Sequence, residues 1–408
     1  MLNVAVINGG RGASGLITAF LDRPYINLTS IVNAYDDGKS TGEIRKFFGM
    51  LGPSDLRKVQ QLMLPIDDPN FSIYQTLFNH RFPKDVSRKS VFKEINHFLE
   101  NKNSTLVGLK IESFYVESNI KKFLTSFLNC LNSIEKLRNS KFNFSDCSIM
   151  NCIYAGAYLH FNRNIADSTL FFGKLFNLRG NVIATSIENK YLVALRENGE
   201  MLYSEAEIVE LRSNVRIERI YLLDEPLPRS SFQSFSQQEK KYYLNQHNCH
   251  VPINQSVILT LKQADIIIYS AGTQHSSLYP SYISTGLSET IANNKKAIKI
   301  FVTNIGADYE TPKYKASDYI LGAFKYLNLS DSRSYRMEEL FDYNLINKSE
   351  NLGCESYVKY DKEKFDDINV KKILKNFESK KFPGKHDGDL LVDEILSLNE
   401  NKNTKTFI

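Results

Sequence analysis

The chain has 408 residues, of which 42% are hydrophobic and 24% charged, and a formal net charge of +5. These values describe a soluble globular protein of one large domain or two. The basic residues are scattered along the chain, so we expect no nucleic-acid partner. The cysteines show no metal-ligand spacing, which indicates reduced thiols. No apolar run approaches the ~20 residues of a membrane span, and Met1 leads directly into a strand, so we expect a cytoplasmic protein.

The chain opens with a strand, a glycine-rich turn and a helix. Residues 3–7 are an apolar strand, residues 8–15 read Asn-Gly-Gly-Arg-Gly-Ala-Ser-Gly, and residues 16–21 continue as a helix. Glycines let the backbone approach a diphosphate, whose charge then lies at the helix N-terminus. The alternative is a tight strand-to-helix connection without a ligand. The candidate binding residues of this turn are Gly9, Gly10, Gly12, Ser14 and Gly15.

A second polar turn, residues 33–42, follows an apolar strand at residues 28–32. The adjacent carboxylates of Asp36 and Asp37 can hold a cation or a proton, and the hydroxyl of Ser40 can meet phosphate oxygens. The two acids follow the glycines by roughly the 20 residues that are usual in a doubly wound nucleotide-binding unit. The alternative is a solvated turn, because Asp, Gly, Ser and Lys are ordinary turn residues.

Residues 49–58 form a third polar turn, in which Gly and Pro break the chain. We expect Ser54 or Asp55 to cap a helix that runs to about Leu64. The acid of Asp55 and the guanidinium of Arg57 then face the same corner. An isolated feature of this kind is more often a helix cap than a site, but beside the other two turns it favours a phosphate-binding pocket.

A fourth polar turn, residues 271–277, follows a buried strand at residues 266–269. Its Gly272, Thr273 and Ser276 suit the phosphates or the sugar of a ligand. The alternative is an ordinary connection between a strand and a helix.

The segments between the turns indicate how the chain is organised. Residues 83–144 have helical spacing and predict a helical insertion, and residues 146–157 read as a buried helix. Residues 181–223 contain several strand-like runs and predict a small β-rich section. The basic tract at residues 371–381 reads as a solvated helix. The strands that precede the polar turns favour an α/β fold with a mostly parallel, Rossmann-like sheet.

The motifs, in their order along the chain, resemble those of the CofD-like superfamily. This superfamily joins the 2-phospho-L-lactate transferase of deazaflavin coenzyme synthesis with the YvcK-type gluconeogenesis factors, which bind UDP-sugars. Each motif is weak alone, but the set is specific and covers nearly the whole chain. The matching motifs are the Gly9-Gly10 turn, Asp36-Asp37-Gly38 with Ser40 and Gly42, residues 52–57, Arg81-Phe82, residues 148–151, residues 177–180 with Thr185 and Ser186, residues 272–278, residues 304–311, Ser317-Asp318 and residues 386–388.

The resemblance implies a single CofD-like domain over residues 1–408, folded as a three-layer α/β sandwich with the insertion at 83–144 and the β-rich section at 181–223. It also implies a transferase in which a hydroxyl acceptor attacks the phosphate attached to lactate in a guanylyl-activated donor, and GMP leaves. The implied catalytic residues and Mg²⁺ ligands are Asp36, Asp37 and Asp55. The implied nucleotide-binding residues are Gly9, Gly10, Gly12, Ser14, Gly15, Ser40, Arg57, Arg81, Asn151, Ser186, Gly272, Thr273 and Ser276. A homodimer is expected from the family alone.

The chain departs from the family pattern in its turns. Arg11 and Ser14 reshape the first turn, Lys39 stands where a second glycine is usual, and Ser54 replaces a glycine before Asp55. One alternative function is therefore a non-catalytic, UDP-sugar-binding regulatory protein of the YvcK type that acts through a protein partner. A dinucleotide-dependent oxidoreductase is less favoured, because it leaves the additional polar turns unexplained. Retention of the three aspartates favours the transferase.

Overall fold

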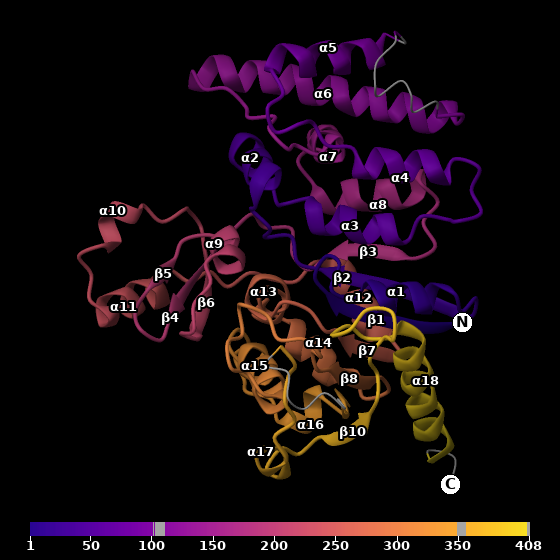
Figure 1. Ribbon diagram of the computed structural model, residues 1–408, viewed down its shortest axis with the longest axis vertical. Coiled ribbons are helices and arrows are strands. Elements are labelled where there is room, and N and C mark those ends of the chain that lie inside the picture. The colour runs from indigo at the N-terminus through magenta and orange to yellow at the C-terminus, as the bar shows by residue number, and fades with distance from the viewer. Residues whose placement is uncertain (101, 103–110, 349–355, 406–408) are drawn as a thin grey trace.

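The computed structural model describes residues 1–408 apart from 101, 103–110, 349–355 and 406–408. Among the described residues, the centre of the fold is a seven-stranded parallel sheet with the order β10-β9-β8-β7-β1-β2-β3 (Figure 1). Its strands are β1 Leu2–Asn8, β2 Ile26–Val32, β3 Asn181–Ala184, β7 Ile266–Tyr269, β8 Ile298–Val302, β9 Tyr343–Asn347 and β10 Lys371–Lys375.

The strand order places a ligand-binding crevice beside β1. The chain runs from β1 to β2 and β3 on one side, and then from β7 to β8, β9 and β10 on the other. Strands β1 and β7 pair from Val4 opposite Ile266 to Ile7 opposite Tyr269, so their carboxyl ends lie together. In an open α/β sheet, ligands bind outside the carboxyl ends of the strands where the winding direction reverses. The first, second and fourth polar turns leave the sheet at the ends of β1, β2 and β7.

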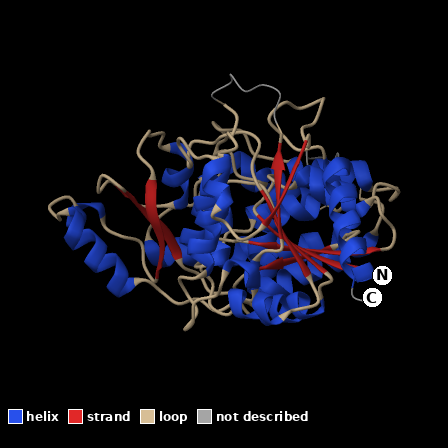
Figure 2. Cartoon of the chain, turned by 90° about the horizontal axis from the view of Figure 1, so that it is seen from below, coloured by secondary structure: helices blue, strands red, loops and turns tan. Residues whose placement is uncertain are grey.

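Helices flank this sheet (Figure 2). Helix α1 packs along α18, where a Cβ added to Gly388 would come within 2.0 Å of the carbonyl oxygen of Gly15. A second group, α12, α14 and α16, packs in succession. The predicted three-layer α/β fold is thus confirmed. The helices around the sheet are α1 Ser14–Leu21, α2 Lys39–Phe48, α3 Ser54–Leu62, α4 Phe71–Asn79, α7 Ile149–His160, α8 Ile165–Leu175, α12 Gln255–Gln263, α13 Tyr279–Tyr282, α14 Leu287–Asn293, α15 Ala316–Leu327, α16 Met337–Leu340, α17 Lys362–Asp366 and α18 Gly388–Lys405, with a short π-helix η1 at Gln274–Leu278.

The insertion at 83–144 forms a helical arm beside α7 (Figure 1). It contains α5 Arg88–Leu99 and α6 Phe114–Arg138, as its helical spacing predicts. A Cβ added to Gly156 of α7 would come within 1.8 Å of the carbonyl oxygen of Phe123 in α6, so the two helices need a residue without a side chain at their contact. Phe123 is fully buried and joins the core of the sheet.

A second projection, which we call the β lobe (residues 191–247), lies at the side of the body (Figure 1). Its three strands form an antiparallel sheet with the order β5-β4-β6. Val193, Tyr221 and Leu244 belong to a small core of its own. The elements of the β lobe are β4 Tyr191–Arg196, β5 Met201–Leu202, α9 Glu205–Glu210, β6 Ile217–Leu223, α10 Arg229–Phe232 and α11 Gln237–His247.

Some predicted elements differ from the structure. The solvated helix predicted at 371–381 is wrong, because Lys371–Lys375 is the edge strand β10, whose Ile373 packs against the core while lysines stay at the edge. The first run of the predicted β-rich section is β3, which belongs to the large sheet. Neither Ser54 nor Asp55 caps α3, since the N-cap position is Pro53. Both side chains are therefore free to reach the polar turns beside them.

In the part of the chain that the structure describes, no helix combines the length and the apolar character that crossing a bilayer requires.

Candidate functional site

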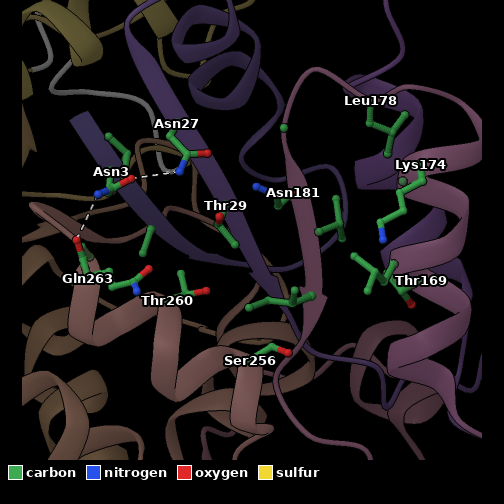
Figure 3. A pocket seen from close by; sticks show the side chains of 18 of the residues that line it. Asn3, Asn27, Thr29, Thr169, Lys174, Leu178, Asn181, Ser256, Thr260 and Gln263 are labelled. Atoms are coloured by element: carbon green, nitrogen blue, oxygen red, sulfur yellow. Dashed lines mark hydrogen bonds between the residues drawn. The ribbon is translucent and has the colours of Figure 1, made fainter. Parts of the chain in front are cut away.

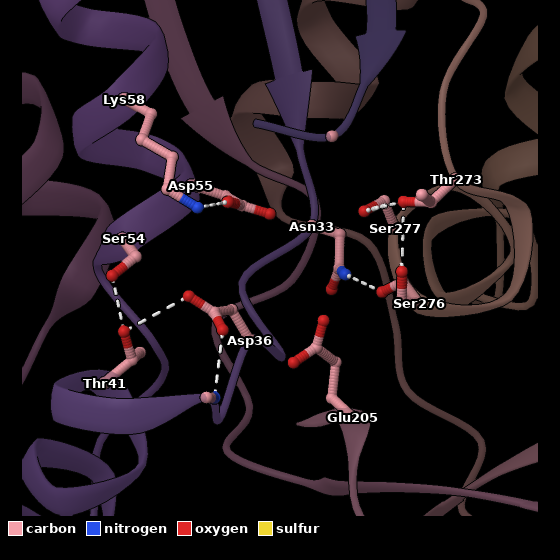
Figure 4. A network of polar contacts seen from close by, with 12 residues as sticks. Asn33, Asp36, Thr41, Ser54, Asp55, Lys58, Glu205, Thr273, Ser276 and Ser277 are labelled. Atoms are coloured by element: carbon pink, nitrogen blue, oxygen red, sulfur yellow. Dashed lines mark hydrogen bonds and ion pairs between the residues drawn. The ribbon is translucent and has the colours of Figure 1, made fainter. Parts of the chain in front are cut away.

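The four predicted polar turns meet around one cavity of about 420 Å³ (Figure 4). It opens at the carboxyl ends of β1, β2 and β7, where the strand order predicts a ligand. Helix α9 of the β lobe forms a further wall. The residues that line the cavity are Gly9, Gly10, Arg11, Gly12, Asp36, Gly38, Lys39, Thr41, Ser54, Asp55, Lys58, Arg81, Glu205, Ala206, Val209, Glu210, Gly272, Thr273, Ser276 and Ser277.

The glycines of the first turn allow the other turns to approach it. A Cβ on Gly10 would lie 2.5 Å from a carboxylate oxygen of Asp55. A Cβ on Gly12 would lie 3.0 Å from the Cα of Gly272, so the first and fourth turns touch through their backbones. Such distances exclude ordinary side chains at these positions. The glycines therefore shape the cavity by keeping Asp55 and the fourth turn close.

One side of the cavity is acidic. Asp36 accepts hydrogen bonds from the backbone N–H of Gly38 at 3.1 Å and from the hydroxyl of Thr41 at 3.2 Å. Asp55 is buried and accepts a hydrogen bond from the ammonium of Lys58 at 2.8 Å. Burial raises the pKa of Asp55, and the Lys58 charge opposes this rise. Figure 4 shows Asp36 and Asp55 on the turns that face the cavity.

A third carboxylate, Glu205 of the β lobe, completes the acidic side. It is 8% exposed and belongs to the first turn of α9. Burial raises the pKa of Glu205 well above its ordinary value, and the charges of Asp36 and Asp55 add to the rise. The mutual effect of these carboxylates indicates that they share one poorly solvated space. Sequence reasoning did not identify Glu205, because nothing in its local pattern differs from that of an ordinary helix start.

Asp37 does not line this cavity. Its carboxylate accepts hydrogen bonds from the backbone N–H groups of Glu205 at 3.4 Å and Ala206 at 2.8 Å, at the start of α9. In return, the carboxylate of Glu205 accepts the backbone N–H of Asp37 at 3.4 Å. Of the three aspartates predicted as metal ligands, the structure thus brings Asp36 and Asp55 to the cavity and directs Asp37 to the β lobe.

The cavity is also lined by basic side chains. Arg11, Lys39 and Arg81 line it, and Arg81 donates a hydrogen bond to the carboxylate of Asp146 at 3.2 Å. Arg57 lies behind them, buried, with its guanidinium bonded to the carbonyl oxygen of Phe78 at 2.6 Å. Burial, together with the positive charges of the nearby Arg81 and Arg11, lowers the pKa of Arg57 to about 10. Positive charge therefore accumulates here, as expected for an anion-binding surface.

Several predicted binding residues support the walls rather than line the cavity. Asn151 is fully buried, and its amide donates hydrogen bonds to the hydroxyls of Ser40 and Ser54 at 3.2 Å each. Ser54 in turn pairs with Thr41, which reaches Asp36 (Figure 4). Asn151 thus links the starts of α2 and α3 to the acidic side. Ser186 is buried outside the cavity and accepts the backbone N–H of Glu188 at 3.2 Å.

The fourth turn is held by a buried acid that sequence reasoning missed. Glu310 is 3% exposed and accepts the backbone N–H groups of His275 at 2.8 Å and Ser276 at 3.0 Å, together with the Ser276 hydroxyl. The hydroxyls of Thr273 and Ser277 lie 2.8 Å apart at the mouth of the turn. Asn33 also fixes this turn by donating to the carbonyl oxygen of Ser276 at 3.0 Å (Figure 4). Glu310 therefore orients the turn without facing a ligand.

A larger cavity, of about 730 Å³, adjoins the first one across Arg11 and Gly272. It contains the predicted residues Ser14 and Gly15 as well as apolar side chains such as Leu16. Among the described residues, three of its buried polar atoms have no hydrogen-bond partner; they are Ser270 Oγ, Asp308 Oδ2 and His386 Nε2. An apolar cleft with a few free polar groups suits the organic part of a ligand whose phosphates lie next door.

The acidic side fits Mg²⁺. Carboxylate oxygens are the ligands that this ion prefers, and it usually takes one or two carboxylates together with substrate phosphates and water. Asp36 and Asp55 supply such oxygens in a cavity that basic side chains also line. Among the described residues, no three His, Cys, Asp or Glu side chains are grouped as ligands of one ion. The protein itself would thus supply a partial ligand set.

Comparison with known proteins identifies the family. The sequence profile described as 2-phospho-L-lactate transferase CofD matches residues 4–378. The chain belongs to the CofD family. A gluconeogenesis factor of Listeria innocua is 24% identical over 407 residues, which cover 98% of this chain and 97% of that protein. A gluconeogenesis factor of Bacillus subtilis is 22% identical over 321 residues, covering 78% of this chain and 72% of that protein.

The fold of this CofD family member also matches a solved structure. The crystal structure of a UPF0052 family protein from Bacillus halodurans superposes with a TM-score of 0.67 at 19% identity, covering 97% of this chain and 100% of that one. At this identity the match concerns the fold alone.

A further cavity, of about 480 Å³, lies at the amino-terminal half of β1, β2 and β3 (Figure 3). Its polar side chains are mainly neutral amides and hydroxyls, such as Asn27, Thr29 and Asn181, and Lys174 is the one charged residue in its lining. Neither acids nor several cations meet there. Strands β1, β2 and β3 run parallel, so their amino-terminal halves lie away from the polar turns at their carboxyl ends. This cavity is therefore not a candidate for the phosphate site.

Proposed function

We propose that the protein is a Mg²⁺-dependent transferase that resembles the 2-phospho-L-lactate transferases. It binds a nucleotide diphosphate derivative and transfers a phospho-acyl group to a small hydroxyl acceptor, with release of a nucleoside monophosphate. The observation that supports this proposal is that Asp36, Asp55, Arg11 and Arg81 line the same cavity. Carboxylates and guanidiniums in one cavity suit phosphoryl transfer, because the first can hold a cation and the second can hold phosphate.

Each side of the cavity has a role in this reaction. Arg11 and Arg81 balance the charge of the diphosphate, and the hydrogen-bonded hydroxyls of Thr273 and Ser277 have one proton between them to donate to its oxygens. Mg²⁺, held by Asp36 and Asp55, would supply further neutralisation of the phosphate charge. The acceptor oxygen forms a bond to the outer phosphorus, the bond from that phosphorus to the bridging oxygen breaks, and the nucleoside monophosphate leaves. Asp55, with its raised pKa, takes the proton of the acceptor hydroxyl.

A second candidate is a non-catalytic nucleotide-sugar sensor. The engagement of Asp37 with the β lobe favours it, because one of the three expected carboxylates is then unavailable for chemistry. The same contact connects the cavity to the β lobe, through which a protein partner could detect a bound ligand. The names of the relatives, gluconeogenesis factors, agree with a role of this kind.

A thermal-shift panel separates the two candidates. It contains GDP, GMP, UDP, UDP-N-acetylglucosamine and NAD⁺, each with and without Mg²⁺. A ligand that binds the folded state raises the melting temperature. The transferase predicts stabilisation by GDP or GMP that needs Mg²⁺ and is lost in Asp55→Asn. The sensor predicts a Mg²⁺-independent response to the UDP-sugar, and silence toward every nucleotide contradicts both.

A further inference from the structure

Two residues at the rim of the cavity adopt a backbone conformation that is unfavourable for their side chains. Lys39 has φ +46° and Asp146 has φ +51°. Residues with a Cβ rarely enter this left-handed region, whereas glycine enters it freely. The ammonium of Lys39 and the carboxylate of Asp146 lie 3.6 Å apart. Asp tolerates this conformation better than Lys does, so the clearer strain lies at Lys39, which lines the cavity.

The ion pair itself does not explain a lysine at this position. The Lys39 side chain is 66% exposed, and exposed ion pairs contribute little to stability. Asp146 is also shared, because its carboxylate accepts a hydrogen bond from Arg81 at 3.2 Å and its backbone carbonyl oxygen accepts a second one. One carboxylate therefore serves two cations, and net positive charge remains.

The surroundings of Lys39 leave this charge available. Lys39 lines both the main cavity and a recess of about 300 Å³ beside it, which also contains Lys84, Glu43 and Asp146. The recess contains the acids Glu43 and Asp146 and the cations Lys39 and Lys84, so with Arg81, which also bonds Asp146, the cations exceed the acids by one. The ammonium of Lys39 thus lies where the cavity continues away from the first turn.

We propose that Lys39, held beside Arg81 by Asp146, determines substrate specificity by binding an anionic group on the part of the ligand beyond the diphosphate. The group is a carboxylate or a phosphate. This inference rests on the proposed binding of a nucleotide diphosphate in the cavity. Lys39 lines both the cavity and the recess, and backbone strain of this kind is concentrated at functional sites.

Lys39→Gly tests the proposal with a matched control. Lys313 also has a left-handed backbone, with φ +61°, but is absent from the cavity lining. Both Lys39→Gly and Lys313→Gly relieve the same type of strain, so we expect neither to lower the melting temperature and each to raise it by about 1 °C. A lysine with a purely structural role would instead give a lower melting temperature in Lys39→Gly.

Binding measurements then use pairs of ligands that differ by one anionic group. UDP-glucose with UDP-glucuronate, and GDP-mannose with GDP-mannuronate, test a carboxylate, whereas GDP with GTP tests a phosphate. We expect the wild type to bind the more acidic member of one pair about five- to tenfold more tightly at low salt. Lys39→Gly should lose this preference while its affinity for the other member changes less than about twofold. Lys313→Gly should keep the preference.

These measurements distinguish the role of Lys39 from the proposed nucleotide site. If the wild type binds a nucleotide diphosphate but shows no preference that depends on Lys39 in any pair, the role of Lys39 is wrong and the nucleotide site stands. If no nucleotide diphosphate binds to the wild type, the proposed function fails and this inference fails with it.

Discussion

Asp37 and Glu205, which are 168 residues apart in the sequence, form reciprocal hydrogen bonds. The backbone N–H of Asp37 donates to the Glu205 carboxylate, and the backbone N–H of Glu205 donates to the Asp37 carboxylate, at 3.4 Å each. A third hydrogen bond, from the N–H of Ala206 to Asp37, is shorter at 2.8 Å. Asp37 thus stabilises the start of α9, as an N-cap residue of the helix itself would do. This contact brings Glu205 to the wall of the cavity.

The first prediction concerns this contact. Asp37→Ala removes the acceptor for two backbone N–H groups of α9, so hydrogen exchange at residues 205–210 should become faster, with a loss of about 1 to 2 kcal/mol in local stability. Asp37→Asn keeps one acceptor oxygen and should give a smaller change. Unchanged exchange in Asp37→Ala would show that the β lobe is fixed by other contacts.

The second prediction concerns Gly10. In Gly10→Ala the added methyl group would meet the Asp55 carboxylate at 2.5 Å, so Asp55 must move. We expect turnover to fall about a hundredfold, because misplacement of a reacting group by an ångström has that effect. Gly173→Ala is the control, since a Cβ there meets nothing within 4 Å and lies in helix α8. It should be neutral or stabilise by about 0.5 to 1 kcal/mol. Normal turnover in Gly10→Ala would remove Asp55 from the chemistry.

The third prediction concerns pH and Glu310. Burial and the charge of Asp308 raise the pKa of Glu310, hydrogen bonds from Ser276 and His275 oppose the rise, and the net pKa is about 8. Between the ordinary glutamate pKa and about 8, the folded state therefore binds a proton that the unfolded state has lost. Stability contributed by this group is full below the ordinary pKa and falls as the pH rises to about 8.

Urea unfolding of the wild type and Glu310→Gln at pH 5 and pH 9 measures this effect. The free energy of unfolding of the wild type should fall by a few kcal/mol relative to that of the variant as the pH rises. Parallel pH dependence in the two proteins would mean that the three hydrogen bonds to Glu310 outweigh its burial.

The sequence predicts several strands of both sheets because these strands are short and apolar. The predicted strand at residues 266–269 is β7 of the large sheet, and the strand-like runs within residues 181–223 include β4 and β6 of the β lobe. It fails at β10, where charge on an edge strand imitates a solvated helix. Strand β9, Tyr343–Asn347, was not predicted.

The sequence predicts part of the candidate site. Asp36, Asp55, Arg81 and Thr273 follow strands or breaks that local patterns reveal, and the structure brings them to one cavity. Glu205 reaches the site only through a contact between distant segments, so no local pattern could identify it, whereas Glu310 lies in the motif at residues 304–311 but was not singled out there. Asn151 and Ser186 were expected at a ligand but lie in the walls. The roles given to all these residues remain predictions.

A crystal structure with GDP and Mn²⁺ in place of Mg²⁺ tests the central claim most directly. We expect anomalous density for Mn²⁺ between Asp36 and Asp55, and density for the diphosphate between these two aspartates and Arg81. The Asp55→Asn protein should show no such density. Nucleotide bound away from these residues, or Mn²⁺ density elsewhere in the presence of bound nucleotide, would contradict it.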